Sequence, residues 1–197
     1  MKDTKNIKKF LKTVFARRVT VINAIIVLIF IFLAIFAPFA APYDPDKPDF
    51  AAFLQLPSAA HLLGTDNFGR DVLSRIIYGT RVSLIIGVLA VFVACVIGTV
   101  FGMIAGYFGG WIDDLITRLM EAVRAIPQII LAMALTAVFG SGIRNLAIIL
   151  GISSMAGYVR MMRGQVLTIK QADYIMAGKL QGNKDFRLMF RHILPNS

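Results

Sequence analysis

Long apolar runs without a charged side chain most constrain what this chain can fold into. The longest, Val82–Ile112, carries no charge for 31 residues. An α-helix rises about 1.5 Å per residue, so about 20 residues cross the roughly 30 Å hydrocarbon core of a bilayer. This run is therefore long enough for a tilted membrane-spanning helix, followed by a turn at residues 106–110.

Three further runs fit the same description: Val19–Ala40, Ala125–Ile143, and Asn145–Val159 extended to Met162. A charged side chain in the middle of a span costs about 2.5–3.5 kcal/mol on insertion scales, and none of these runs carries one at its centre. The pattern predicts an all-α integral membrane protein with four transmembrane helices.

Composition and charge agree with a membrane protein. Hydrophobic residues make up 57% of the chain and charged residues 16%, against roughly 25% charged in soluble domains. The net charge of +10 raises the question of nucleic acid. However, seven of the 21 Lys and Arg lie in the first 18 residues and seven more follow Tyr158, so both groups flank apolar spans. This placement favours a lipid bilayer and no nucleic acid as partner.

The basic residues also predict the orientation. With four spans both ends lie on one side, and both are basic, whereas the loop 41–81 holds five Asp and only four Lys or Arg. The positive-inside rule places both ends in the cytoplasm, with the loop near 140–142 outside and residues 111–124 inside. We expect a basic cytoplasmic N-terminus (1–18), an uncleaved first helix (19–40), an extracytoplasmic loop with a short amphipathic helix (41–81), and a partial transmembrane domain (82–197) with a cytoplasmic loop (164–197).

Small residues recur every fourth position in the second span. This spacing puts them on one helix face, where another helix backbone can approach closely. The stripe predicts tight helix packing, within this chain or against another subunit, at Ala90, Ala94, Gly98, Gly102 and Gly106.

The loop 41–81 contains a glycine pair with the spacing of a phosphate-binding P-loop. The pair is Gly64 and Gly69, in a motif that also contains Thr65, Asp66, Arg70 and Asp71. A P-loop continues with Lys and then Ser or Thr, but this chain has Arg70 and Asp71, and an aspartate there would repel phosphate. We expect a helix N-cap at Asp66 instead, and no ATP site.

The last part of the chain is polar and basic. Residues 171–180 favour a helix, and Gly182 can adopt the left-handed conformation that ends one. Residues 184–192 favour a second short helix that ends before Pro195, with Phe186, Met189 and Phe190 on one flank. Such a segment either docks on a soluble partner or lies on anionic lipid as a basic amphipathic helix.

The side chains give no sign of catalysis or metal binding. The two histidines, His61 and His192, are predicted on opposite sides of the membrane, and Cys95 is alone in an apolar run. The sequence contains no paired carboxylates, nucleophile–base set or metal-ligand cluster. We expect no catalytic residue and no bound metal.

A succession of short motifs resembles one transporter family. The motifs include Ala41-Pro42-Tyr43-Asp44-Pro45, His61-Leu62-Leu63-Gly64-Thr65-Asp66, Gly69-Arg70-Asp71, Gly106-Tyr107-Phe108-Gly109-Gly110-Trp111-Ile112-Asp113, Ala125-Ile126-Pro127 and Arg191-His192-Ile193-Leu194-Pro195-Asn196. From about Ala34 onward the chain is similar to ABC importer permeases of the dipeptide/oligopeptide and nickel branch, and within it to the "C" permease.

This resemblance implies that the last segment is the Glu-Ala-Ala loop, through which such permeases couple to their ATPases. The matching positions here are Met176-Ala177-Gly178, so only the alanine is kept. Family members usually have six helices, so the resemblance implies a chain truncated after this loop. The implied coupling residues are Tyr174, Ala177, Gly182, Asp185, Arg187, His192, Leu194 and Pro195.

The resemblance also implies partners. These are a homologous permease forming a heterodimer, two cytoplasmic ABC ATPases that bind ATP and Mg, and an extracytoplasmic solute-binding protein. The chain itself would be non-catalytic, without a cofactor, in a bacterial or archaeal cell membrane. Peptides are the first expected solute, and nickel, metal chelates or glutathione are alternatives. An ATP-independent secondary transporter is the rival class, but such proteins usually carry an ionisable residue within a span.

Overall fold

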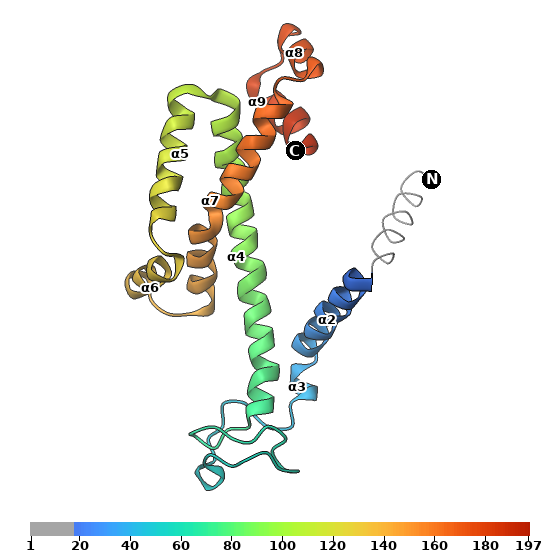
Figure 1. Ribbon diagram of the computed structural model, residues 1–197, viewed down its shortest axis with the longest axis vertical. Helices are drawn as coiled ribbons and strands as arrows, with labels where there is room; N and C mark the ends of the chain where they lie inside the picture. Colours follow the sequence, from blue (N-terminus) through green and yellow to red (C-terminus); the bar gives the residue numbers. More distant parts are fainter. Residues whose placement is uncertain (1–17) are drawn as a thin grey trace. The chain divides into compact units, whose positions relative to one another are not determined.

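The chain is built of helices in the computed structural model, which describes residues 18–197 (Figure 1). Over this range no strand forms, and a single isolated bridge joins Thr65 to Asp71. The predicted all-α fold is confirmed. The expected basic N-terminus lies outside the described residues, apart from Arg18.

The chain divides into two units, Met1–Ile85 and Ile86–Ser197, with α4 (Val72–Phe108) running through the division. The described part of the first unit contains α2 (Arg18–Ile35), α3 (Ala37–Ala40) and the short 3₁₀ helix η1 (Phe50–Ala52). The second unit contains the rest of α4, then α5 (Gly110–Ala125), α6 (Gln128–Phe139), α7 (Ile143–Ile169), α8 (Asp173–Leu180), α9 (Asp185–Leu188), η2 (Met189–Ile193) and η3 (Leu194–Asn196).

Three helices among the described residues are long and apolar enough to cross a membrane: α2, α4 and α7. α2 is apolar on all sides and only 6% of it is buried, which suits a helix surrounded by lipid. α4 has 37 residues, so it is about 55 Å long and extends well beyond the hydrocarbon core.

The predicted third span, Ala125–Ile143, differs in the structure. The helix found there, α6, has only 12 residues and is about 18 Å long. The stretch 111–124, expected as an internal connection, is the helix α5 instead. α5 and α6 meet at a bend of 92° and count as one broken span or as a re-entrant pair.

Proline chemistry explains this bend. The residue before a proline is restricted to extended backbone, and Ile126 has φ −89° and ψ 126°, so α5 ends there. α6 then begins directly after Pro127 and ends at Gly140, whose φ is +83°. The side chain of Asn145 closes this end by donating to the carbonyl oxygen of Phe139 at 2.8 Å.

Candidate functional site

The segment from α8 to η3 (Asp173–Asn196, here the α8–η3 segment) turns back at Gly182. Gly182 has φ +77°, and the N–H groups of Gly182 and Asn183 donate to the carbonyls of Lys179 and Gly178 at 2.9 and 3.1 Å. These two bonds form a Schellman motif, the helix ending that favours glycine. The two short helices expected around Gly182 are therefore present, although α7 continues to Ile169 and reaches past the predicted loop start at residue 164.

One face of the α8–η3 segment packs on the ends of α4 and α7. The shared cluster of buried side chains contains Met103 and Tyr107 from α4, Met162 and Val166 from α7, and Ile175, Leu188, Met189 and Ile193 from the segment. Ile175, Leu188 and Ile193 have no exposed surface. Burying a side chain of this size stabilises by about 1.5–3 kcal/mol, so the segment is held firmly against the two long helices.

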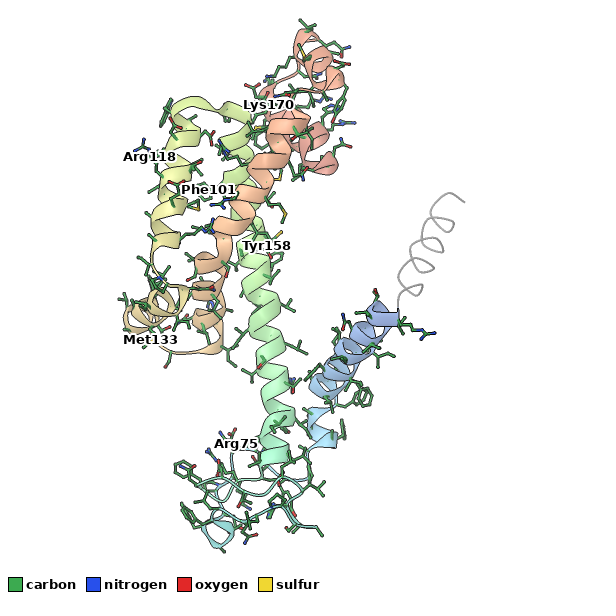
Figure 2. All side chains as sticks on the ribbon, in the orientation of Figure 1. Arg75, Phe101, Arg118, Met133, Tyr158 and Lys170 are labelled. Carbon is green, nitrogen blue, oxygen red and sulfur yellow. The ribbon has the colours of Figure 1, made fainter. Side chains whose placement is uncertain are left out.

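Polar contacts fix the same packing. The hydroxyl of Tyr107 donates to Asp185 Oδ1 at 2.5 Å, and the Lys179 ammonium lies 5.0 Å from the centre of the Tyr107 ring. Lys170, labelled in Figure 2 near the end of α7, donates from Nζ to the carbonyl oxygen of Gly106 at 2.9 Å. Movement of the segment would therefore be transmitted directly to α4 and α7.

The other face of the α8–η3 segment leaves large apolar side chains exposed. Phe186 is 71% exposed and Leu180 89% exposed, and the rings of Phe186 and Phe190 lie 4.4 Å apart. Arg187 is also exposed. We call Leu180, Phe186, Arg187 and Phe190 the exposed apolar patch. Apolar groups gathered on an otherwise polar segment are typical of a surface that binds another protein.

The predicted coupling residues fall on both faces. Tyr174, Ala177, Gly182, Asp185, Arg187 and Pro195 are exposed, whereas His192 and Leu194 are half-buried. Met189 was expected on the flank of Phe186 and Phe190, but it is buried in the core cluster. Met189 lies beside Leu188 and Ile193 in the buried cluster, whereas Phe186 and Phe190 keep the i, i+4 spacing and remain exposed.

Replacing Tyr107 by phenylalanine should loosen the α8–η3 segment. Tyr107→Phe removes the hydroxyl that binds the Asp185 carboxylate, and a hydrogen bond to a charged group is worth about 1.5–3 kcal/mol. We predict that trypsin cleaves at Lys184 about tenfold faster or more in this variant. The control is Tyr174→Phe on α8, because the Tyr174 hydroxyl makes no hydrogen bond within the described part of the chain. Equal cleavage rates in both variants would contradict the prediction.

The small-residue stripe of α4 meets α7 of the same chain. A Cβ atom at Gly98 would come within 2.4 Å of Tyr158 Cβ, and one at Gly102 within 2.5 Å of the Val159 carbonyl oxygen. A Cβ at Gly106 would come within 2.8 Å of Val166 Cβ. Ala94 is fully buried and Ala90 half-buried. The stripe thus allows α4 and α7 to approach at backbone distance.

An ion pair between α5 and α7 was missed in the sequence. Arg163 Nε and Nη2 donate to the two carboxylate oxygens of Asp113 at 2.5 and 2.6 Å. The Thr117 hydroxyl adds a third bond to Asp113 at 3.2 Å. The two charges lie 50 residues apart, next to different apolar runs, and no local pattern shows that they meet. Asp113 and Arg163 each lie directly beyond the end of a predicted uncharged run, at Ile112 and Met162.

The loop before α4 is organised around Asp66. Its Oδ1 accepts from the N–H groups of Phe68 at 2.8 Å and Arg70 at 3.0 Å, and its Oδ2 accepts from Arg70 Nε at 2.9 Å and from Arg75 Nη1. Gly64 and Gly69 have φ near +75°, and a Cβ at Gly69 would collide with the carbonyl of Asp49. The Asp66 carboxylate thus holds this turn together by accepting from backbone and side-chain donors.

The N-cap of α4 is Asp71, and the prediction of Asp66 in this role was wrong. Asp71 Oδ2 accepts from the N–H and the hydroxyl of Ser74, both at 2.8 Å, while Oδ1 lies 3.0 Å from His61 Nδ1. Thr65 is buried, accepting from the Gln55 N–H at 2.8 Å and donating to the Ala52 carbonyl. The expected short amphipathic helix is thus the first part of α4.

These hydrogen bonds make the turn sensitive to acid. Partial burial raises the pKa of Asp66 and Asp71, but bonds from Arg70 to Asp66 and from Ser74 to Asp71 outweigh it and hold both pKa values below the ordinary 3.8. A carboxyl whose pKa is depressed by folding stabilises fully above its unfolded pKa and loses this stabilisation as pH falls through the folded value.

We therefore predict that protection of residues 64–74 from hydrogen exchange is constant from pH 7 to 5 and decreases below about pH 3.8. Each exchange rate is corrected for the intrinsic rate of an unstructured peptide at that pH. In Asp71→Asn, protection should be lower throughout, and the smaller decrease that remains at low pH should be that of Asp66. Constant protection of the unsubstituted chain down to pH 2 would refute this role of the two carboxylates.

Two family models match the chain. Residues 98–197 match the binding-protein-dependent transport system inner membrane component, and residues 7–57 match the N-terminal TM domain of oligopeptide transport permease C. The first match covers α5 to η3 and the glycine end of the α4 stripe. It therefore includes the α8–η3 segment and the helix interface that positions it.

The chain is also similar to known transport permeases. The dipeptide transport system permease protein DppC of Alkalihalophilus pseudofirmus is 42% identical over 91% of this chain and 59% of its own length. The glutathione transport system permease protein GsiD of Pectobacterium atrosepticum is 39% identical over 96% of this chain and 64% of its own length. The DppC of Haemophilus influenzae is 39% identical over 91% of this chain.

The chain spans about three fifths of the length of these relatives. Its candidate spans and the two family models agree that it is a multi-pass membrane protein. The resemblance to dipeptide and oligopeptide permeases, drawn from motifs, is thereby confirmed by the family matches over residues 7–57 and 98–197 and by relatives that align with 91% and 96% of the chain. The chain belongs to the family of binding-protein-dependent transport inner membrane components, as a permease of the oligopeptide C type.

Proposed function

We propose that this chain is the transmembrane permease subunit of an ATP-binding cassette importer for short peptides. It forms part of the solute path and receives the motion of a separate ATPase. The observation that carries the proposal is the two-sided α8–η3 segment. One face is anchored on α4 and α7, and the other exposes the apolar patch (Leu180, Phe186, Arg187 and Phe190).

The proposed mechanism follows from this geometry. The exposed apolar patch docks in a groove of a cytoplasmic ATPase, and closure of two ATPases on ATP and Mg pushes the segment. The buried side chains Ile175, Leu188 and Ile193 pass the push to the ends of α4 and α7. Rigid-body tilting of the packed helices then alternates access to the path. The chain itself is a non-catalytic lever.

The proposed topology has both ends of the chain in the cytoplasm. It is supported by the basic residues of the α8–η3 segment and by the balanced charge of the loop 41–81. The partners are a homologous permease that completes the path, two cytoplasmic ATPases, and an extracytoplasmic solute-binding protein. The proposed location is a bacterial or archaeal cell membrane.

Uptake measurements test the proposal. The gene for this chain is deleted in its host and restored on a plasmid, and uptake of labelled dialanine is measured with and without an intact ATPase partner. We expect uptake to disappear on deletion, return with the plasmid, and disappear again when the ATP site of the partner is inactivated. Unchanged uptake on deletion would refute a role in dipeptide import.

A second candidate solute is glutathione, because one relative that covers 96% of this chain is a glutathione permease. Glutathione and dipeptides share a peptide backbone and a terminal carboxylate. Competition separates them in the same cells. Unlabelled glutathione that abolishes dialanine uptake at a concentration equal to that of dialanine would assign the tripeptide, whereas weak competition favours ordinary dipeptides.

A further inference from the structure

The break between α5 and α6 leaves backbone groups without helical partners. The last carbonyls of α5 and the N–H groups of residues 128–130 lie beyond the reach of i to i−4 bonds. Pro127 supplies no N–H, and no side chain among residues 18–197 caps the start of α6. Donors and acceptors of the peptide backbone therefore come together at Ile126 and Pro127.

A hollow of about 360 Å³ lies at this break. Its lining includes Arg124, Ile126 and Gln128 from the break, together with Ser153 and Ser154 from α7. The volume falls in the range of roughly 300–1,000 Å³ that small-molecule sites occupy. It continues into a smaller hollow of about 100 Å³ between α5 and α7, because Arg124 and Ala156 line both.

Two polar side chains of the hollow keep hydrogen-bonding groups that have no partner among the described residues. Gln128 Nε2 donates to Ser154 Oγ at 3.0 Å. The amide oxygen of Gln128 and the hydroxyl hydrogen of Ser154 have no partner among the described residues. Ser153 differs, since its hydroxyl donates to the Ile149 carbonyl of its own helix at 2.8 Å. Gln128 and Ser154 thus present one acceptor and one donor to the hollow.

Non-helical backbone within a membrane is tolerated where it is buried in protein or lines a water-filled cavity. Residues 125–130 are exposed, so no other part of the described chain buries this backbone. The polar residues of α5 also support a polar hollow, because Asp113, Thr117 and Arg124 recur at helical spacing on one side of the helix. The hollow is therefore suited to water and to polar solutes and unsuited to lipid chains.

We propose that the hollow at the α5–α6 break binds the backbone of a short peptide as it crosses the membrane, with Arg124 pairing with the terminal carboxylate. Neutral donors and acceptors that alternate over a short distance complement a peptide bond. A guanidinium binds a carboxylate through two parallel hydrogen bonds. These contacts reach only the backbone and the terminal carboxylate of the solute, so the same site can bind short peptides of many sequences. This inference rests on the proposed function.

Cysteine labelling in the complete transporter tests the site without relying on activity. Cys95 is replaced by alanine, and Ile126→Cys is reacted with a charged, water-soluble methanethiosulfonate. We expect rapid labelling that dialanine at saturating concentration slows at least threefold. The control is Met133→Cys on α6, because Met133 is 67% exposed and labelled in Figure 2 on the apolar part of that helix. It should remain unlabelled. Labelling of Ile126→Cys as slow as that of Met133→Cys would show a lipid-filled hollow and overturn the proposal.

Uptake kinetics supply a second, matched comparison. Ser154→Ala should raise KM for dialanine about threefold to tenfold, as expected for one lost hydrogen bond. Thr168→Ala should leave KM unchanged, because Thr168 lies on the same helix outside the hollow and its hydroxyl donates to the Gly164 carbonyl. Arg124→Lys keeps the charge at the end of α5 but loses the paired geometry, and should raise KM about tenfold or more. Equal KM for all three variants and the unsubstituted transporter would overturn the site. Absence of dialanine uptake by the unsubstituted transporter would instead refute the proposed function.

Discussion

Placing leucine at Gly102 should destabilise this protein by about 3 kcal/mol or more and abolish transport. A Cβ atom at this position would lie 2.5 Å from the Val159 carbonyl oxygen and 2.8 Å from Met162 Cβ. Both obstacles belong to α7 close to its backbone, so α4 and α7 must separate. Overpacking of a well-packed core costs about 1–3 kcal/mol, and here the separation also loosens the anchor of the α8–η3 segment.

The matched control is Gly87→Leu on the same helix, because a Cβ at Gly87 meets nothing within 4 Å. It should leave the amount of protein in the membrane and its unfolding temperature unchanged. Alanine substitutions at the same two positions give a finer comparison. Gly87→Ala should be neutral or stabilising by up to about 1 kcal/mol, whereas Gly102→Ala should destabilise. Thermal unfolding of the purified full-length protein measures both, and equal effects at the two positions would contradict the tight α4–α7 contact.

Breaking the Asp113–Arg163 pair should cost about 3 kcal/mol. Asp113→Asn leaves the Arg163 guanidinium without its two charge-assisted bonds. Loss of one partner from a buried pair costs about 3–5 kcal/mol, and the lower end applies because the Arg163 side chain is 35% exposed. The same variant should release α5 from α7 and thereby reduce transport.

A double variant distinguishes the pair from either residue alone. Asp113→Leu with Arg163→Met removes both charges and should recover most of the stability that Asp113→Asn loses. Arg118→Met is the control for a charge change on α5, because Arg118 is exposed and Figure 2 shows it on the side of α5 away from α7. It should shift stability by less than about 0.5 kcal/mol. Additive losses in the double variant would contradict a direct pairing.

The membrane spans that follow from simple physics were predicted from the sequence. α2, α4 and α7 correspond to uncharged runs, because a bilayer accepts only helices whose backbone is satisfied internally. α5 was not recognised as a helix, since its charges are typical of a loop between spans. Only the tertiary structure pairs Asp113 with Arg163 and brings α5 beside α7.

The candidate site was predicted in outline and altered in detail. Glycine at position 182 ends α8 as expected, since the left-handed conformation there favours glycine. The burial of Met189 could not be predicted, because it depends on which side of this short helix packs on α4 and α7, and the local sequence does not show that. The bonds of Tyr107 to Asp185 and of Lys170 to Gly106 connect distant parts of the chain, and single residues give no local signal for them.

Docking of the exposed apolar patch on an ATPase is tested most directly by Phe186→Asp in the complete transporter. Phe186 is 71% exposed, so a charge there leaves the fold intact but opposes burial in an apolar groove. The control is Phe50→Asp, which is 73% exposed in the loop proposed to lie outside the membrane. We predict that the ATPase no longer co-purifies with Phe186→Asp while it still co-purifies with Phe50→Asp, at equal amounts of both variants in the membrane. Co-purification of the ATPase with Phe186→Asp at the unsubstituted level would contradict the docking role of this segment.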